Sequence, residues 1–251
     1  MLLLKVLLVP ALIWLIGLAA GKWGPAVAGA LAGFPVITGS ILLILALEQG
    51  DGFAQRAALA AALGAATNVV FGLAYSWACL RWRWLPCLAL SLLAYAASVL
   101  LSRELGAHPW LGAWLALAFL PAAARGFPSP PADPAPAAGR EPGLLPRMLI
   151  GAALVLLITG ASARLGPTLS GLLAVFPVLG SVLAVFSHQS GGRAAAIRLL
   201  RGMARGFYAF IAFCLCLALL LPRASLGLAF ADALCLAAGV QLLALRRARR
   251  G

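Results

Sequence analysis

The chain has 251 residues, of which 64% are hydrophobic and only 10% are charged, and its mean hydropathy is +1.04. A soluble domain has about 45–50% apolar and about 25% charged residues, so this composition excludes an ordinary soluble protein and predicts an all-α membrane protein. The net charge of +13 would suggest nucleic acid in a soluble protein, but in this chain we expect it to set membrane topology, with no nucleic-acid partner.

Apolar runs near the 20 residues that a bilayer requires predict about nine spanning helices. In chain order the runs cover residues 2–21, 25–48, 54–80, 85–102, 108–124, 147–163, 167–188, 197–221 and 225–245. Between the fifth and sixth runs, residues 125–146 contain seven of the 16 prolines. Such a stretch cannot keep a helix, so it predicts an exposed linker.

A segment of 13 residues occurs twice. Residues 24–36 return as residues 166–178 with eight identical positions, including a Gly-Pro and a Phe-Pro pair. Self-similarity at a fixed offset indicates two copies of one unit. The copies lie five predicted spans apart, an odd number, so they should cross the membrane in opposite directions. Coincidence in an Ala- and Leu-rich chain is the alternative, but it would not match both pairs in register.

The repeat divides the chain into three predicted parts. Residues 1–102 form a first four-span repeat, residues 103–146 a connecting span and a cytoplasmic Pro-rich linker, and residues 147–251 a second, inverted repeat with a basic C-terminus. The first run could be mistaken for a signal peptide. Because Met148–Arg164 holds the same place before the second Gly-Pro pair, we expect a retained helix.

The basic residues predict sidedness. Nine spans put the two termini on opposite sides, and 14 of the 19 Lys and Arg residues then fall on the side of the C-terminus. Loops rich in Lys and Arg stay in the cytoplasm, so we expect a cytoplasmic C-terminus and an external N-terminus.

Both copies place a proline near the middle of a span. Pro35 and Pro177 lack an N–H and crowd the carbonyl four residues earlier, Leu31 or Leu173, at a cost of about 3 kcal/mol. In hydrocarbon a freed carbonyl needs another partner or a water-filled cavity. If each helix restarts after its proline, two positive helix ends face the midplane, as in transporters built from repeats.

Close packing is the alternative interpretation. Gly29, Gly33 and Gly171 would let neighbouring helices approach, so each proline could merely kink its helix. For a matched pair at mid-bilayer we expect a substrate site. The residues predicted to line it are Phe34, Pro35, Thr38, Gly39, Ser40, Asn68, Phe176, Pro177, Gly180, Ser181 and Tyr208. Interhelical hydrogen bonding is an equal explanation for Asn68 and Tyr208.

Three titratable residues stand near the predicted spans. Asp232 is the only acid in the middle of a span, a position that usually marks a proton or substrate path, so we predict proton coupling there. The alternative is a structural Asp that faces the bundle. Glu48 and His188 end the two broken helices at similar places and could act as gates, or they could be solvated helix ends.

Basic residues near the cytoplasmic side indicate a lipid partner. Arg198, Arg201 and Arg205 share one face of the eighth predicted helix, where they could reach lipid head groups or attract anions. The terminal arginines at 246–250 predict affinity for anionic lipid. No catalytic motif and no metal-ligand spacing is present. We therefore predict no enzyme activity, no cofactor and no metal.

Residues 171–178 read Gly-Leu-Leu-Ala-Val-Phe-Pro-Val and are followed by His188 and an arginine-bearing helix. In this they resemble the GlpM-type family of small bacterial inner-membrane proteins, chains of about four spans with a similar signature. The resemblance covers each half, best over residues 147–221, and implies two such units fused in one bacterial inner-membrane chain. This chain departs by its duplication and by Glu48 where the second copy has His188. The family has a loose association with exopolysaccharide (alginate) production.

These patterns predict a transporter or facilitator for a small polar or anionic solute, with its site between the two Phe-Pro breaks. The alternative is a non-transporting membrane subunit that assists lipid or exopolysaccharide export, which leaves a lipid-linked substrate open. A second copy of the chain is a further candidate partner. A single mid-span acid argues against an intramembrane lipid-modifying enzyme.

Overall fold

The computed structural model describes residues 2–102, 105, 108–132, 149, 153 and 177–250. The predicted span 147–163, Phe176 and most of the predicted linker lie outside this part of the chain. The described elements are all helices: α1 (Leu2–Trp23), α2 (Pro25–Ala32), α3 (Val36–Gln49), α4 (Asp51–Ala78), α5 (Trp84–Leu101), α6 (Pro109–Arg125), α9 (Val178–Leu220) and α10 (Leu226–Arg250). Of these, α4, α5, α9 and α10 are long and apolar enough to cross a membrane. The protein is thus an all-α membrane protein.

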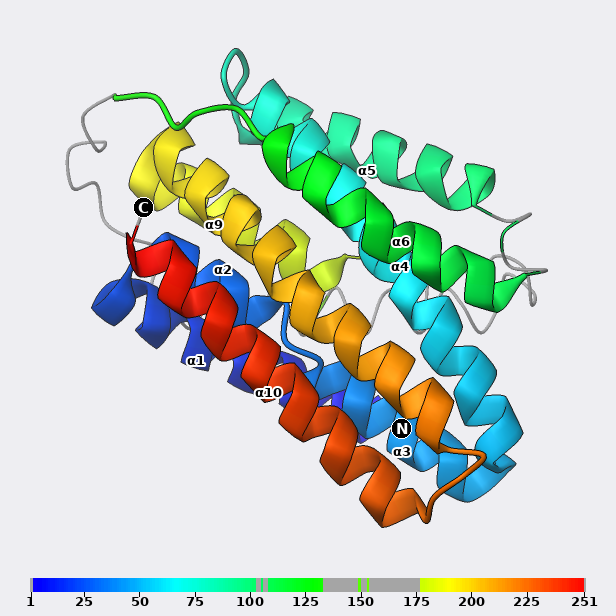
Figure 1. Cartoon of the computed structure of the whole chain (residues 1–251). Coiled ribbons are helices and arrows are strands. Elements are labelled where there is room, and N and C mark those ends of the chain that lie inside the picture. The colour runs from blue at the N-terminus through cyan, green and yellow to red at the C-terminus, as the bar shows by residue number, and fades with distance from the viewer. Residues whose placement is uncertain are drawn as a thin grey trace.

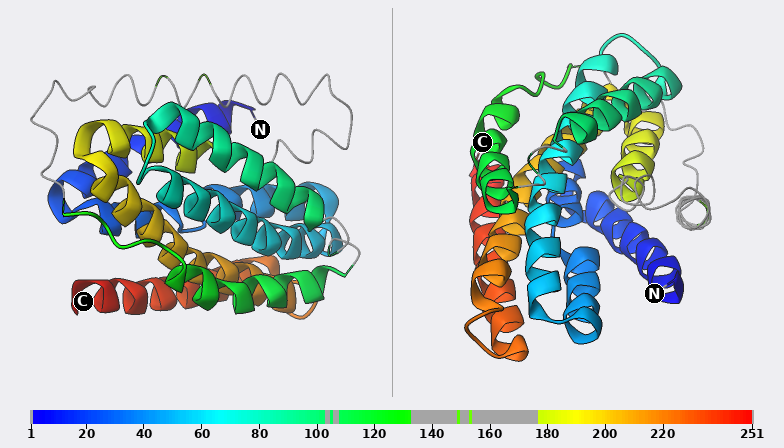
Figure 2. Two further views of the ribbon diagram at one scale, coloured as in Figure 1. Left: turned by 90° about the horizontal axis from the view of Figure 1, so that it is seen from above. Right: turned by 90° about the vertical axis from the view of Figure 1, so that its right-hand side faces the viewer.

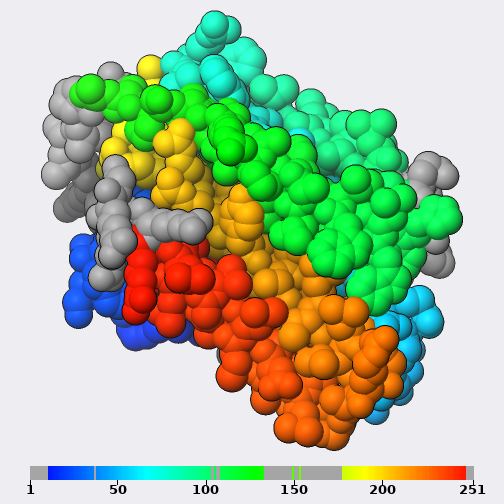
Figure 3. Space-filling view, in the orientation of Figure 1, coloured from blue at the N-terminus to red at the C-terminus, as the bar shows by residue number. Residues whose placement is uncertain are grey.

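Helix α9 is the centre of the bundle. It packs against α2, α4, α6 and α10, and Figure 1 shows it between α10 on one side and α4 and α6 on the other. In the space-filling view α9 is visible between α6 and α10, which form the outer layer of that face (Figure 3). Helix α1 lies at the edge of the bundle and packs mainly against α2 (Figure 2). The residues of α9 are accordingly the most buried of the chain's candidate spans.

Of the three described glycines with positive φ, Gly24 separates α1 from α2, and Gly50 and Gly192 end two further helical segments. Gly50 has φ 84° and ψ 169° and separates α3 from α4. Gly192 has φ 72° and ψ −172° inside α9, so it divides α9 into a first part (residues 178–191) and a second part (residues 193–220). Side chains with a Cβ rarely adopt this backbone conformation, which explains glycine at both positions.

Helix α4 runs antiparallel to the second part of α9. Near the beginning of α4, the Gln55 side-chain amide donates to the carbonyl of Ala218, 2.7 Å away. Near its other end, Gly72 lies against the Leu200 side chain. These two helices match the predicted spans 54–80 and 197–221, and the contacts fix their relative direction.

The beginning of the predicted linker is bonded to the bundle: Phe127 and Pro128 are buried, whereas Arg125, Gly126 and Ser129 are exposed. The Trp77 indole N–H donates to the Gly126 carbonyl at 2.8 Å, and the Arg201 guanidinium donates to the carbonyls of Phe127 and Pro128 at 2.8 and 3.3 Å. The Phe127 side chain is 4% exposed. Arg201 therefore has a structural partner inside the chain, where the sequence suggested a lipid contact or an anion vestibule.

Candidate functional site

The predicted span 25–48 consists of two helices separated by Gly33–Pro35. The Phe34 N–H donates to the Leu31 carbonyl at 3.1 Å, a tight i→i−3 bond that ends α2, and the Val36 N–H donates to the Phe34 carbonyl at 2.8 Å. Pro35 has φ −78° and ψ 43°, which is outside the helical region. The chain therefore stops one helix and begins another around the proline, where the sequence analysis placed the break.

One carbonyl freed by this break is that of Ala30. The sequence predicted Leu31, and that prediction was wrong because the last turn tightens: Phe34 donates to Leu31 and no longer to Ala30. The side chain of Gln241 on α10 replaces the missing donor, with its Nε2 2.8 Å from the Ala30 carbonyl oxygen. Gln241 is 5% exposed, and its Oε1 has no hydrogen-bond partner within the described residues. A buried polar side chain thus satisfies the backbone at the break.

Glycines bring the break into contact with the second part of α9. A Cβ on Gly29 would collide with the Leu199 carbonyl, and a Cβ on Gly206 would collide with the Ala30 carbonyl and approach Gly33 to 3.0 Å. Both helices therefore carry a Gly-xxx-Gly pattern at the contact, an arrangement that lets helix backbones approach closely in a membrane. Gly29 and Gly33 were expected at a close contact, whereas the matching pattern in residues 202–206 was not predicted from the sequence.

The second proline lies close to the first break. Pro177 has φ −76° and ψ 57°, and the Ser181 N–H donates to its carbonyl at 2.8 Å, as the first helical bond of α9. A Cβ on Gly180 would lie 3.3 Å from the Met203 methyl carbon, and a Cβ on Gly33 would lie 2.7 Å from the Met203 carbonyl oxygen. Met203 therefore lies against both the first break, through its backbone, and the beginning of α9 after Pro177, through its side chain.

The polar residues predicted to line the site are in part used by the protein itself. The Ser40 hydroxyl donates to the Val36 carbonyl at 3.0 Å, and the Asn68 side-chain amide donates to the Gly64 carbonyl at 3.0 Å. By contrast, the Ser181 hydroxyl is buried and has no partner among the described residues. Its oxygen is a polar group that a solute or water near Pro177 could use.

The remaining predicted residues fall into two groups. Thr38, Gly39 and Phe34 are half-buried on α3 or at the break, and Gly39 faces the Phe213 ring of α9. Tyr208 is half-buried on the outer side of α9, within electrostatic reach of Arg125. The structure brings Phe34, Pro35, Pro177 and Gly180 to the neighbourhood of Met203, and it gives no contact that adds Asn68 or Tyr208 to them.

Asp232 lies away from the breaks. It is on the exposed face of α10, whereas Phe230, Ala233 and Gln241 form the buried face. The alternative of a structural Asp turned into the bundle is wrong for this chain. Proton coupling through Asp232 would therefore act at the outer surface of α10.

Glu48 and His188 have different surroundings. Glu48 is exposed at the end of α3, as a solvated helix end would be. His188 is half-buried, its Nδ1 lies 3.3 Å from the Tyr75 hydroxyl of α4, and the two rings meet edge to face.

The two copies keep one register beyond the prolines. Gly50 and Gly192 stand 142 positions apart, which is also the offset between Pro35 and Pro177. At this offset Glu48 corresponds to Ser190 and not to His188.

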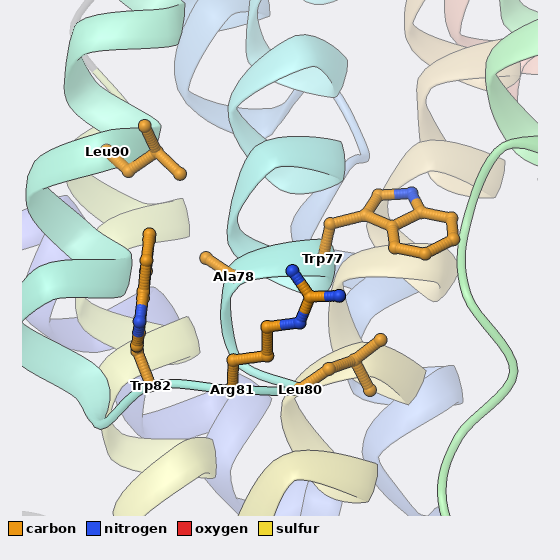
Figure 4. A pocket seen from close by; sticks show the side chains of 6 residues that line it. All are labelled: Trp77, Ala78, Leu80, Arg81, Trp82 and Leu90. Carbon is orange, nitrogen blue, oxygen red and sulfur yellow. The ribbon is translucent and has the colours of Figure 1, made fainter.

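Two pockets lie beside the loop between α4 and α5. One, of about 280 Å³, is lined by Trp77, Ala78, Leu80, Arg81, Trp82 and Leu90 and is almost wholly apolar (Figure 4). The other, of about 310 Å³, is lined by Arg83, Trp84, His188 and Gln189. Neither pocket is lined by residues of the break at Pro35 or by Pro177, and neither was predicted from the sequence. The signal for this region is the run Trp77–Trp84, with three tryptophans and two arginines.

No family model, no curated protein and no solved structure matches this chain.

Proposed function

We propose that the protein is a membrane transporter or facilitator for a small polar or anionic solute, with its site between the breaks at Pro35 and Pro177. The observation that carries the proposal is that Met203 lies against both the break at Pro35 and the beginning of α9 after Pro177. The helices α3 and α9 each begin after one of these prolines, and helix N-termini that meet at one site are a usual element of a transporter site.

Backbone geometry supports two inverted repeats. Pro35 and Pro177 have ψ values of 43° and 57°, and Gly50 and Gly192 repeat one left-handed conformation at the same offset of 142 residues. The helices that follow these glycines, α4 and the second part of α9, run antiparallel. Inverted repeats would have this relationship. From the apolar runs and the distribution of Lys and Arg we propose nine spans with a cytoplasmic C-terminus, in a bacterial inner membrane, as the resemblance to the GlpM-type family implies.

Tight packing at the break assigns the present arrangement to a closed state of the proposed transporter. Gly33 and Gly206 are in backbone contact, which leaves no room for a solute between them. Alternating access would separate α2 and α3 from α9, exposing the Ala30 carbonyl and the Gln241 side chain. Because glycine has no side chain, two helices in contact through glycines can separate with few changes of side-chain rotamer.

Uptake into vesicles tests the proposal. The purified chain is reconstituted in liposomes, and uptake of a panel of small anions and neutral solutes is measured with Pro35→Ala and Pro177→Ala variants. We expect both variants to reduce uptake of the transported solute severalfold, while Pro222→Ala, in the exposed turn after α9, leaves it unchanged. Asp232→Asn should remove any dependence on a proton gradient.

Three outcomes decide between the candidate functions. Uptake no faster than in empty liposomes, with a co-purifying lipid or export partner, would reject transport in favour of the non-transporting subunit. Folded proline variants with wild-type uptake would reject the midplane site. Fluxes far above carrier turnover would identify a channel.

A further inference from the structure

Two pockets lie beside the loop between α4 and α5, with Trp82 lining one and the next residue, Arg83, lining the other. We infer that this region binds one anionic phospholipid, with the acyl chain in the apolar pocket and the phosphate among the arginines. The inference rests on the proposed function only for the choice of leaflet. Its test measures lipid binding and not transport, so the two proposals can fail separately.

The apolar pocket fits a hydrocarbon chain. Trp77 and Trp82 are 58% and 50% exposed although both are large and apolar. Figure 4 shows Arg81 rising from the loop between these two rings, with Leu90 of α5 beyond Trp82. The Trp77 indole N–H is already bonded to the Gly126 carbonyl, so this ring presents its apolar surface. Tryptophans of this kind mark the membrane–water interface.

The second pocket offers hydrogen-bond donors. Its four lining residues are Arg83, Trp84, His188 and Gln189, each of which carries at least one N–H group when His188 is neutral. The Tyr75 hydroxyl meets His188 at Nδ1; when the phenol donates this bond, the imidazole proton is on Nε2. A set of donors around a pocket of about 310 Å³ matches an oxyanion such as a phosphate diester.

The positive charge of the region is not neutralised within the described chain. Arg81, Arg83 and Arg193 gather around this loop, and Arg193 donates to the Leu80 carbonyl at 3.1 Å. Residues 52–103 and 142–231 contain no Asp or Glu. The only acid of the described helices that form the pockets is Asp51, in the first turn of α4 and thus at the end far from this loop, and an anionic ligand complements the charges.

The proposed sidedness places this loop at the cytoplasmic leaflet, where anionic lipids are concentrated. A free anion would satisfy the arginines equally well, because a phosphate group is common to both ligands. The apolar pocket beside Arg81 favours the lipid, since a free anion has no group to place against Trp82 and Leu90.

Lipid retention by the full chain tests the inference. The protein is placed in nanodiscs of phosphatidylcholine with a small fraction of phosphatidylglycerol, and bound lipid is measured by native mass spectrometry. We expect preferential retention of phosphatidylglycerol, weakened about 10- to 30-fold in an Arg81→Gln/Arg83→Gln double variant. Arg223→Gln is the matched control, because Arg223 is exposed at the opposite end of α9 and bonds only within its own turn.

A second variant and a second ligand separate lipid from free anion. Leu90→Trp fills the apolar pocket and should weaken lipid retention severalfold while leaving the arginines intact. Inorganic phosphate, added to lipid-free micelles, should change the thermal transition little. Equal retention of both lipids by the wild type, unchanged retention in the folded double variant, or strong stabilisation by phosphate that Leu90→Trp does not affect would each overturn the lipid assignment.

Discussion

The side-chain amide of Gln241 donates a hydrogen bond to the carbonyl of Ala30, 211 residues earlier in the chain and 2.8 Å away. Ala30 lies in the last turn of α2, where the tightened turn before Pro35 removes its helical donor. In a soluble protein bulk water could take this place, but at the depth of a membrane span the donor must come from another protein group or from a water-filled cavity. The bond therefore ties α10 to the break that defines the candidate site.

Replacing Gln241 should destabilise the folded protein. Gln241→Leu keeps a side chain of similar size but leaves the Ala30 carbonyl without a donor, and we expect a loss of about 0.6–2 kcal/mol in the free energy of unfolding. Thermal or denaturant unfolding in detergent micelles measures it. Gln49→Leu, at the exposed end of α3, is the control and should change stability little. Equal stability of the Gln241→Leu variant and the wild type would show that the bond carries no net energy.

Two glycine-to-alanine substitutions should change the free energy of unfolding in opposite directions. A methyl group on Gly206 would collide with the Ala30 carbonyl, so Gly206→Ala should force α2 and α9 apart at a cost of about 1–3 kcal/mol. Gly239 on α10 has open space around its Cβ position, and Gly239→Ala should stabilise the helix by up to about 1 kcal/mol. Unfolding midpoints of the two variants should therefore move in opposite directions. Two shifts of the same sign would contradict the close approach of α2 and α9.

Backbone conformation alone should decide the effect of alanine at Gly50. Its Cβ position is empty, but φ of 84° with ψ of 169° is a region that residues other than glycine rarely enter. Gly50→Ala should therefore cost about 1–3 kcal/mol. Gly52→Ala, two residues later in the first turn of α4, should be neutral or stabilising. Comparable unfolding free energies for the two variants would show that the turn after α3 relaxes without cost.

The repeated segment predicted the position of the break, because a proline inside a helical span removes a hydrogen bond and must kink or end the helix. The partner of the freed carbonyl was not predictable in the same way. Gln241 stands in a span whose Ala-rich sequence leaves its buried face undefined, and only the packing of Phe230, Ala233 and Ala237 against the bundle turns Gln241 inward. The same packing places Asp232 on the exposed face, which its mid-span position did not reveal.

Long-range contacts explain the other differences. The Gly-xxx-Gly pattern at residues 202–206 was readable in the sequence, but nothing in it named α2 as the partner. The beginning of the linker has the composition of an exposed segment, yet Arg201 and Trp77 bond its carbonyls. Such bonds join residues about 50 to 75 positions apart, so the local composition of the linker cannot predict them.

Tyr75 and His188 should be energetically coupled, because their side chains meet between α4 and the first part of α9 with a 3.3 Å polar contact and ring centroids 5.9 Å apart. Tyr75→Phe removes only the hydroxyl, and His188→Leu removes the imidazole. A double-mutant cycle on unfolding free energies should give a coupling of about 0.5–1.5 kcal/mol. The same cycle with Gln189→Leu, an exposed neighbour of His188, should be additive. Additivity in the first cycle would mean that the hydroxyl and the imidazole do not stabilise each other. The imidazole of His188 would then be available for contact with the lipid or the solute.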